Sequence, residues 1–326
     1  ITPLTKISND EYLLELHHGP TYAFKDIAMQ FIARLMDFYL SRDNTTINIL
    51  GATSGDTGAA AIEGFSKTQS TNIFILHPHN KITDIQRKFM TTVKSKNVFN
   101  IAIEGNFDDC QKIIKSIFAD NNFKKNNKLT AVNSINWARI MCQIVYYFYC
   151  VSRLPSNKRI NFSVPTGNFG DIFAGYIASK MGLIINNLVI ATNENDILAR
   201  TLKDGQHTLK EVLATSSPSI DIQISSNFER LIYDVTKDSE YIKKIMDDLI
   251  SKKNYVLKTD IISVIKKHFS AYSINQDEVT LLINSLFTEK KITIDPHTAV
   301  GLAASRKNKS SQCIDVILST AHPTKF

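Results

Sequence analysis

The sequence predicts an α/β protein made of two lobes, each with a parallel sheet in three layers. Short apolar runs rich in β-branched residues alternate with amphipathic helical patterns, and this alternation is typical of parallel sheets covered by helices on both faces. A chain of 326 residues is long enough for two domains, and a hydrophobic content of 43% is ample for their cores.

Strands are expected where β-branched and aromatic residues cluster between turn residues. These runs are 12–16, 47–50, 72–76, 98–103, 161–164, 188–191 and 313–318. Between them apolar residues recur at helical spacing, as in the stripe Ile27, Phe31, Leu35 and Phe38. The helical patterns cover 25–40, 58–67, 84–93, 108–119, 138–153, 171–181 and 296–306.

The polar, turn-prone stretch 153–158 is the expected boundary between the lobes. It gives a smaller lobe, 19–155, and a larger lobe that combines 1–18 with 156–326. The section 227–290 is charged and poor in strand patterns, so it is expected to form a helical insertion on the second sheet. The Asn- and Lys-rich stretch 121–128 is expected to be a solvated loop.

Composition narrows the classes of function. The net charge of +7 comes from 38 basic and 31 acidic residues, and the lysines are scattered, so no nucleic-acid groove is expected. No apolar run has the length of a membrane span, which predicts no membrane association. Four cysteines without a C-x-x-C pair indicate reduced thiols in a cytoplasmic protein. The paired histidines are expected to be structural, and no metal site is predicted.

Lys25 is the strongest candidate for a catalytic side chain. It follows the turn Gly19-Pro20 and stands where a helical pattern begins. The peptide dipoles at a helix start and the nearby apolar side chains both disfavour a charged ammonium group. A lysine held partly neutral is a nucleophile that can form a Schiff base with an aldehyde cofactor. Taken alone, the pattern also fits a surface lysine in the first turn of a helix.

Two glycine-rich turns follow strands and open helices. The first, 51–58, carries Thr53, Ser54 and Asp56, and hydroxyl and amide groups at a helix start can bind an anion. It has neither the Walker nor the Rossmann spacing, so a plain strand-to-helix turn is the alternative. The second, 165–171, can wrap a phosphate with backbone N–H groups, or it can be a helix start capped by Asp171.

Two polar segments complete the set of candidates. Ser134, Asn136 and Arg139 precede or open a long aromatic helix, and an arginine fork suits a phosphate or a carboxylate. The alternative is a helix cap by Asn136 with Arg139 facing solvent; Trp137 is expected in the core. Thr320 follows the last apolar strand, where ligands collect in α/β sheets, and its hydroxyl can hydrogen-bond a ring nitrogen. Otherwise this segment is a turn ended by a proline.

These motifs, in this order, resemble the threonine synthase family of pyridoxal-phosphate (PLP) enzymes, which have the tryptophan-synthase-β-like architecture, PLP fold type II. The matching segments are LLELHHGPTYAFKD, GATSGDTGAAA, AVNSINWARIMCQIVYYF, VPTGNFGD, VIATNEND, DPHTAVG and LSTAHPTKF. They span nearly the whole chain except 227–290, and the first and last contain highly specific strings. Members of this family normally have an additional N-terminal segment and some chain after the last motif, so we expect this chain to lack both.

The resemblance implies a PLP-dependent lyase of threonine biosynthesis that converts O-phosphohomoserine and water to threonine and phosphate. It implies that Lys25 carries the Schiff base and then moves protons, that Thr320 faces the pyridine nitrogen, and that Asp56 lies beside the ring hydroxyl. Many relatives in the wider fold group have asparagine at this last position, and the S-G-D-T-G form resembles the longer threonine synthases. The residues implied to hold the cofactor phosphate are Gly167, Asn168, Phe169, Gly170 and Asp171. Those implied to bind the substrate are Thr53, Ser54, Ser134, Asn136 and Arg139.

Two other functions fit the same motifs. One is a PLP-dependent phospholyase acting on O-phosphothreonine or a related phosphoamino acid. The other is a PLP-binding protein without turnover. In either case the expected partner is a small molecule, and the chain is expected to be a monomer or a homodimer.

Overall fold

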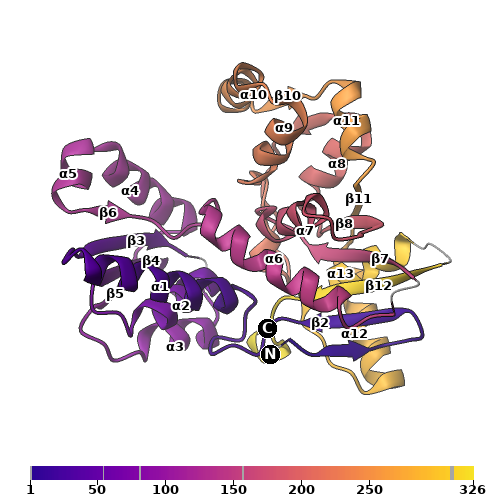
Figure 1. Ribbon diagram of the computed structural model, residues 1–326, viewed down its shortest axis with the longest axis horizontal. Coiled ribbons are helices and arrows are strands. Elements are labelled where there is room, and N and C mark those ends of the chain that lie inside the picture. Colours follow the sequence, from indigo (N-terminus) through magenta and orange to yellow (C-terminus); the bar gives the residue numbers. More distant parts are fainter. Residues whose placement is uncertain (1, 54, 81, 156–157, 309–311) are drawn as a thin grey trace. The chain divides into compact units, whose positions relative to one another are not determined.

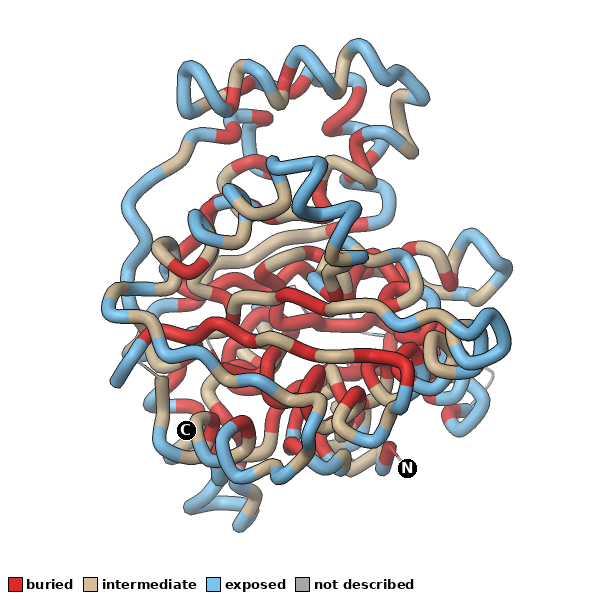
Figure 2. Tube along the Cα trace, turned by 90° about the vertical axis from the view of Figure 1, so that its left-hand side faces the viewer, coloured by how far each residue is buried: buried red, intermediate tan, exposed pale blue. Residues whose placement is uncertain are grey.

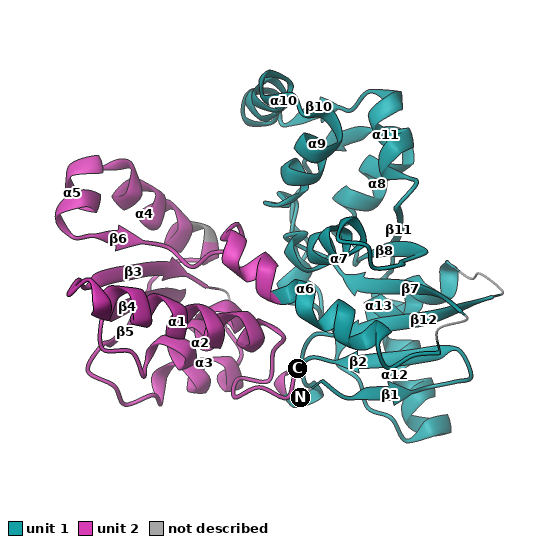
Figure 3. Ribbon diagram, viewed as in Figure 1, with its two compact units in different colours: residues 1–16, 143–324, 326 teal, residues 17–142, 325 magenta. Residues whose placement is uncertain are grey.

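The computed structural model describes residues 2–53, 55–80, 82–155, 158–308 and 312–326. The chain divides into two compact units, shown in Figure 3. Unit 2 consists of His17–Cys142 and Lys325, and unit 1 consists of Ile1–Leu16, Gln143–Thr324 and Phe326. The division falls inside helix α6 (Trp137–Val151), whereas the polar stretch 153–158 follows that helix.

Unit 2 has a four-stranded parallel sheet with the strand order β5-β4-β3-β6 (Figure 1). The strands are β3 (Ile47–Ala52), β4 (Thr71–Pro78), β5 (Val98–Ile103) and β6 (Leu129–Thr130). Ile49 and Ile73 pack with helices α1 (Lys25–Arg42) and α2 (Asp56–Phe65), while Leu50 and Leu76 pack on the opposite side near α4 (Phe107–Ala119). Because successive strand residues point to opposite faces, this unit has three layers.

Unit 1 has a six-stranded sheet with the order β1-β2-β12-β7-β8-β11. Its strands are β1 (Leu4–Lys6), β2 (Glu11–Glu15), β7 (Arg159–Pro165), β8 (Asn187–Thr192), β11 (Phe269–Ser273) and β12 (Cys313–Ser319). All pairs are parallel except β1 with β2, an antiparallel edge hairpin that the alternation of patterns did not predict. Helices α7 (Gly170–Lys180), α8 (Ile197–Asp204), α12 (Gln276–Lys290) and α13 (Pro296–Lys307) flank this sheet.

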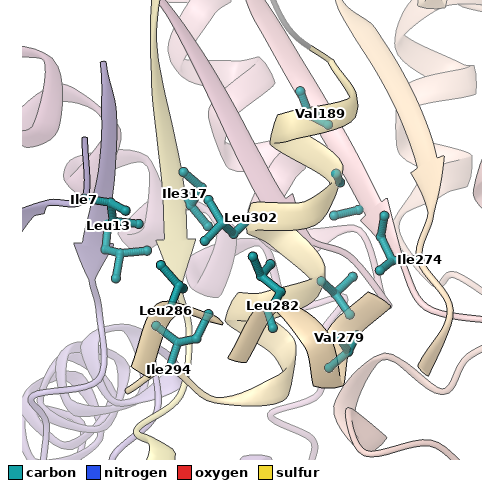
Figure 4. Packing of buried hydrophobic residues seen from close by; sticks show 14 of the residues in the cluster. Ile7, Leu13, Val189, Ile274, Val279, Leu282, Leu286, Ile294, Leu302 and Ile317 are labelled. Carbon is teal, nitrogen blue, oxygen red and sulfur yellow. The ribbon is translucent and has the colours of Figure 1, made fainter. Parts of the chain in front are cut away.

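One hydrophobic core of unit 1 lies between the sheet and the α12–α13 pair (Figure 4). Ile317 of β12 and Val189 of β8 contribute from the sheet, and Leu302 and Leu286 contribute from the helices. In Figure 2 buried residues follow the strands, and exposed residues gather on outer helices and loops. Buried packing on both faces of the sheet therefore fixes where the strands end. The sheet is a rigid support for the side chains at the carboxyl ends of its strands.

The section 227–290 contains helices α9 (Phe228–Thr236), α10 (Ser239–Lys252), α11 (Thr259–Ile265) and α12, which agrees with its helical pattern. It also contains strand β11, which pairs with β8, and β10 (Asn254–Val256), which pairs with β9 (Gln206–Thr208). The section is therefore strand-poor, as expected, but it does more than cover the second sheet, because β11 is one of the strands of that sheet. The expected loop 121–128 was wrong in part, since Asp120 caps the short helix α5 (Asn121–Asn126).

Each of the seven strands expected from the sequence is present within one or two residues at either end, and so are the seven helices, with α3 (Asp84–Thr91) among them. The four cysteines are all buried. In the part of the chain that the structure describes, no helix combines the length and the apolar content that crossing a bilayer requires.

His207 provides a pH test of the fold of unit 1. The residue is 2% exposed, its ring stacks on Tyr255 with centroids 4.4 Å apart, and its Nδ1 lies 2.8 Å from the Thr201 hydroxyl. Burial, assisted by the charge of Arg200, lowers the pKa of His207 from 6.5 to about 4. The unfolded chain therefore binds this proton at a higher pH than the folded chain, so this stabilisation is complete above pH 6.5 and lost as the pH falls towards 4.

We expect the free energy of unfolding to fall by up to about 3 kcal/mol over that interval because of His207. Urea unfolding of the His207→Asn variant should show a flatter dependence on pH between 6.5 and 4. The same substitution at His79, whose side chain is 47% exposed, is the control for loss of a histidine outside this packing. An unchanged slope in the His207 variant would contradict the assignment.

Candidate active site

Lys25 is the first residue of α1, and a tight turn holds it there. The Thr21 amide and hydroxyl both donate to the Asp26 carboxylate, at 2.9 and 2.6 Å. A Cβ on Gly19 would lie 2.4 Å from Asp26 Oδ2, so this turn needs glycine at that position. The Lys25 side chain is 13% exposed, and its Nζ lies 4.8 Å from the centre of the Phe24 ring. Lys25 therefore lies at a helix start, as the sequence predicts, and its side chain is nearly buried rather than on the surface.

Asp56, the first residue of α2, lies beside that amine. Its Oδ2 is 3.7 Å from Lys25 Nζ, and its Oδ1 accepts a hydrogen bond from Gln86 Nε2 at 3.0 Å. Lys325, whose side chain is 0% exposed, forms an ion pair with the same Oδ1. Burial raises the pKa of Asp56, but the ammonium groups of Lys25 and Lys325 outweigh burial and hold that pKa below its usual value. Asp56 is thus a carboxylate held between two lysines.

The substrate-binding candidates of unit 2 follow two neighbouring strands. Strands β3 and β6 pair in parallel, so the turn after β3 and the segment after β6 lie at the same edge of the sheet. The Thr53 hydroxyl accepts from the amides of Gly55 and Gly58, at 2.9 and 2.8 Å, and it can still donate its own proton. Ser54 lies outside the described residues.

In the segment after β6, the structure agrees with one part of the alternative interpretation, the helix cap, and disagrees with the other, the solvent-facing arginine. Asn136 Oδ1 accepts from the Ala138 amide at 3.0 Å, so Asn136 does cap α6. Arg139 does not face solvent: it is 4% exposed, and its Nη1 donates to the Val132 carbonyl at 3.2 Å. Ser134 is half-buried beside them. Trp137 is 47% exposed, so the expectation that it lies in the core was wrong.

In unit 1, the turn 165–171 connects β7 to α7. Phe169 is the N-cap residue and has a φ of 62°, and no side chain caps the helix. Gly167 is buried, and a Cβ there would lie 3.0 Å from the Ser219 carbonyl oxygen. The alternative of a cap by Asp171 was wrong, because its carboxylate accepts from the hydroxyls of Tyr146 and Tyr147. The backbone N–H groups at this helix start are therefore not satisfied by a capping side chain.

Residues that the sequence did not single out hold this turn in place. Ser225 Oγ donates to the Gly167 carbonyl at 2.6 Å, and Asn227 Nδ2 donates to the Asn168 carbonyl at 2.8 Å. Ser226 Oγ donates to Asn168 Oδ1 at 2.9 Å. The adjacent segment is fixed in turn by His297, whose Nε2 accepts from the Ser219 amide at 3.1 Å. In the sequence, the only indication of this role was that residues 225–227 carry hydroxyl and amide side chains, which can hydrogen-bond a turn.

Thr320 comes directly after β12, and β12 pairs in parallel with β7. Thr320 and the turn 165–171 therefore lie at the carboxyl ends of neighbouring strands of one sheet. Thr320 is 7% exposed. Ser319, next to it, has its Oγ 3.1 Å from the Thr298 hydroxyl, which anchors this end of the strand to α13.

These residues fit a phosphorylated aldehyde cofactor. The uncapped, buried start of α7 offers amide donors to a phosphate group, and the Gly167 position leaves room only for backbone. Lys25 is a nearly buried primary amine, and a primary amine is the group that captures an aldehyde covalently. The hydroxyl of Thr320 suits a neutral ring nitrogen.

Comparison with known proteins agrees with that fit. The sequence matches the family described as pyridoxal-phosphate dependent enzyme over residues 1–316. The chain is 44% identical to the threonine synthase of Pseudomonas aeruginosa over 329 residues, which cover 100% of this chain and 70% of that protein. The crystal structure of PLP-bound threonine synthase from Brucella melitensis has a TM-score of 0.95 and 46% identity, and covers 99% of this chain and 70% of that one. Maize serine racemase, at 13% identity with a TM-score of 0.69, covers 98% of this chain and 87% of that one and shares the fold alone.

The chain therefore belongs to the pyridoxal-phosphate-dependent enzymes of the tryptophan-synthase-β-like architecture, and PLP is its cofactor. The same architecture extends to the racemase, so the fold by itself does not define the reaction. Within this class the chain is a member of the threonine synthase family.

Proposed function

We propose that this chain converts O-phospho-L-homoserine and water to L-threonine and inorganic phosphate, with PLP as cofactor. The observation that carries the proposal is the nearly buried Lys25 beside Asp56, in a chain 44% identical to a threonine synthase over its full length. When bound, PLP supplies an electron sink for carbanion chemistry. The chain's own residues supply binding, orientation and proton transfer.

The proposed role of Lys25 is twofold. Its amine would anchor the cofactor, and when free it would take the α-proton of the substrate and return protons later in the reaction. A position at the start of α1, held by the Thr21–Asp26 hydrogen bonds, gives the amine a fixed origin from which to reach these protons. Asp56 is proposed to lie beside the ring hydroxyl of the cofactor.

Two phosphates with different fates must be held, because the cofactor phosphate stays and the substrate phosphate leaves. We assign the cofactor phosphate to the amides of Gly167, Asn168, Phe169, Gly170 and Asp171, where no side chain caps α7. The Asp171 carboxylate is engaged by tyrosines, so its role there is to fix the helix start. We assign Thr320 to the pyridine nitrogen.

The substrate phosphate is assigned to Thr53, Ser54, Ser134 and Arg139, and Asn136 is assigned to substrate binding without a contact to the phosphate. Arg139 supplies the charge, and a guanidinium group can form two parallel hydrogen bonds with a phosphate. A dehydratase or sulfhydrylase of this fold needs only one phosphate-binding site, the one for the cofactor phosphate. The buried arginine in the first turn of α6 is therefore the feature that favours a phosphorylated substrate.

The test is an absorbance spectrum of the PLP-loaded chain before and after addition of O-phosphohomoserine, with phosphate and threonine measured alongside. We expect a change in the cofactor band and equal amounts of phosphate and threonine. Release of 2-oxobutyrate with phosphate would instead identify a phospholyase, and a cofactor band without any product would identify a binding protein. We further propose a cytoplasmic monomer or homodimer, which analytical ultracentrifugation of the loaded chain tests for its oligomeric state.

A further inference from the structure

Lys325 is a buried lysine to which the proposed reaction gives no role. Its side chain is 0% exposed, which is rare for lysine because the charged group loses its hydration. Its Nζ donates to the Thr21 carbonyl at 3.0 Å and pairs with Asp56 Oδ1. It also lies 5.7 Å from the centre of the Phe89 ring. These contacts compensate the burial of an ammonium group and fix its position.

The contacts of Asp56 are unequal. Lys325 holds Oδ1 directly, and Gln86 donates to that same atom at 3.0 Å. Lys25 lies 3.7 Å from Oδ2, beyond the distance of a normal hydrogen bond. Of these two lysines, Lys325 is therefore the closer partner of the carboxylate, and the amine of Lys25 is the more distant one.

We propose that Lys325 is a positioning residue for the reaction, which holds the Asp56 carboxylate and keeps Lys25 from being locked as its ammonium partner. The proposal rests on the proposed function only for the role of Lys25. Only a neutral amine can attack an aldehyde or accept a proton, so an amine fixed in a buried ion pair would be inert. Lys325 acts in two ways: it forms the direct ion pair with the carboxylate, and its own positive charge opposes a second cation nearby.

The charged groups around Lys25 fit this role. Asp26 of α1 is engaged by Thr21, Asp56 begins α2, Gln86 of α3 is neutral, and Lys325 belongs to the short C-terminal helix η2 (Pro323–Lys325). Burial raises the pKa of Asp26, and Lys325 is one of the groups that oppose this rise. The depressed pKa of Asp56 likewise depends on both lysines. The fixed positive charge of Lys325 thus lowers the pKa of both carboxylates, Asp26 and Asp56.

The test measures the protonation of Lys25 directly, without turnover. The full chain, freed of cofactor, is treated with trinitrobenzenesulfonate across a pH series, and labelling of the Lys25 peptide is quantified by mass spectrometry. In Lys325→Met we expect the midpoint of the labelling profile to rise by about one pH unit, which is roughly tenfold slower labelling below the midpoint. Lys325→Arg should restore the original midpoint, because it returns the charge.

Lys307→Met is the matched control. Like Lys325, Lys307 pairs with a carboxylate, Glu278, at 2.7 Å, and donates to a backbone carbonyl, that of Ser273, at 3.2 Å. It lies in unit 1 on α13, so its loss should leave the Lys25 midpoint unchanged. If Lys325→Met does not fold, Lys325→Gln serves instead, because an amide can still donate to Asp56 and Thr21 while carrying no charge.

A midpoint that stays fixed or falls in a folded, uncharged Lys325 variant overturns the proposal, and so does an equal shift in Lys307→Met. Labelling does not depend on the identity of the substrate. A shifted midpoint in a chain that makes no threonine would therefore retain the role of Lys325 and reject the proposed function. Normal threonine formation with an unchanged midpoint in the Lys325 variants would retain the proposed function and reject the role of Lys325.

Discussion

Replacement of Lys25 by alanine should abolish threonine formation, with a loss on the order of 10⁴-fold or more. The reason is that one amine provides both the covalent anchor of the cofactor and the base for the α-proton, so two steps fail together. The visible absorbance of bound cofactor should change, and borohydride should no longer fix the cofactor to the chain. Threonine production and the spectrum of the PLP-loaded variant are the two measurements.

Two controls separate the chemistry of Lys25 from its charge. Lys25→Arg keeps a cation beside Asp56 but cannot form the covalent bond, so it should be as inactive as the alanine variant. Lys67→Ala removes an exposed lysine that follows α2 and pairs with Glu63, and it should retain full activity. Partial recovery of the alanine variant by an added small alkylamine would support a missing amine as the cause. Turnover by either Lys25 variant at the original rate would remove this residue from the mechanism.

The elements that the sequence predicts well are those whose signals are local. Strand β5 is read from the run 98–103 alone, and α1 from a stripe of apolar residues after Asp26. Strand β11 was not predicted because 269–273 has no alternation of its own. Its place in the sheet comes from pairing with β8, about eighty residues earlier in the sequence, and such register is a tertiary property.

The same distinction applies to the site. A glycine-rich turn after a strand identifies 165–171 without further information, whereas the hydrogen bonds that hold it come from Ser225 and Asn227 in a distant segment. Lys325 belongs to a motif that the sequence identifies, but its bond to Thr21 joins residues 304 positions apart. Nothing within a short window reveals that this lysine is buried. Sequence patterns thus predicted the groups that can meet the ligand more readily than the groups that orient them.

Loss of the charge of Arg139 is the second change with a large expected effect. In Arg139→Met we expect the KM for O-phosphohomoserine to rise roughly 10- to 100-fold, because a charge-assisted pair of hydrogen bonds to phosphate is lost. Affinity for PLP should change much less, since the cofactor phosphate is assigned to the start of α7. Arg139→Lys should be intermediate, because it keeps the charge and loses the planar fork.

The structural role of Arg139 must be separated from its role in binding, because its Nη1 also holds the Val132 carbonyl at 3.2 Å. Arg200→Met is the matched control: this arginine donates to the Thr208 carbonyl at 3.0 Å and to Asp196, and it lies in unit 1 on α8. Both variants lose an arginine bound to a backbone carbonyl, but only the Arg139 variant should raise KM. Inorganic phosphate, as a product, competes for the same positive charge. Its inhibition constant should therefore rise in the Arg139 variant by the same factor as the KM for O-phosphohomoserine. Equal losses of substrate and PLP affinity would show instead that Arg139 supports the fold of the site and does not bind the leaving phosphate.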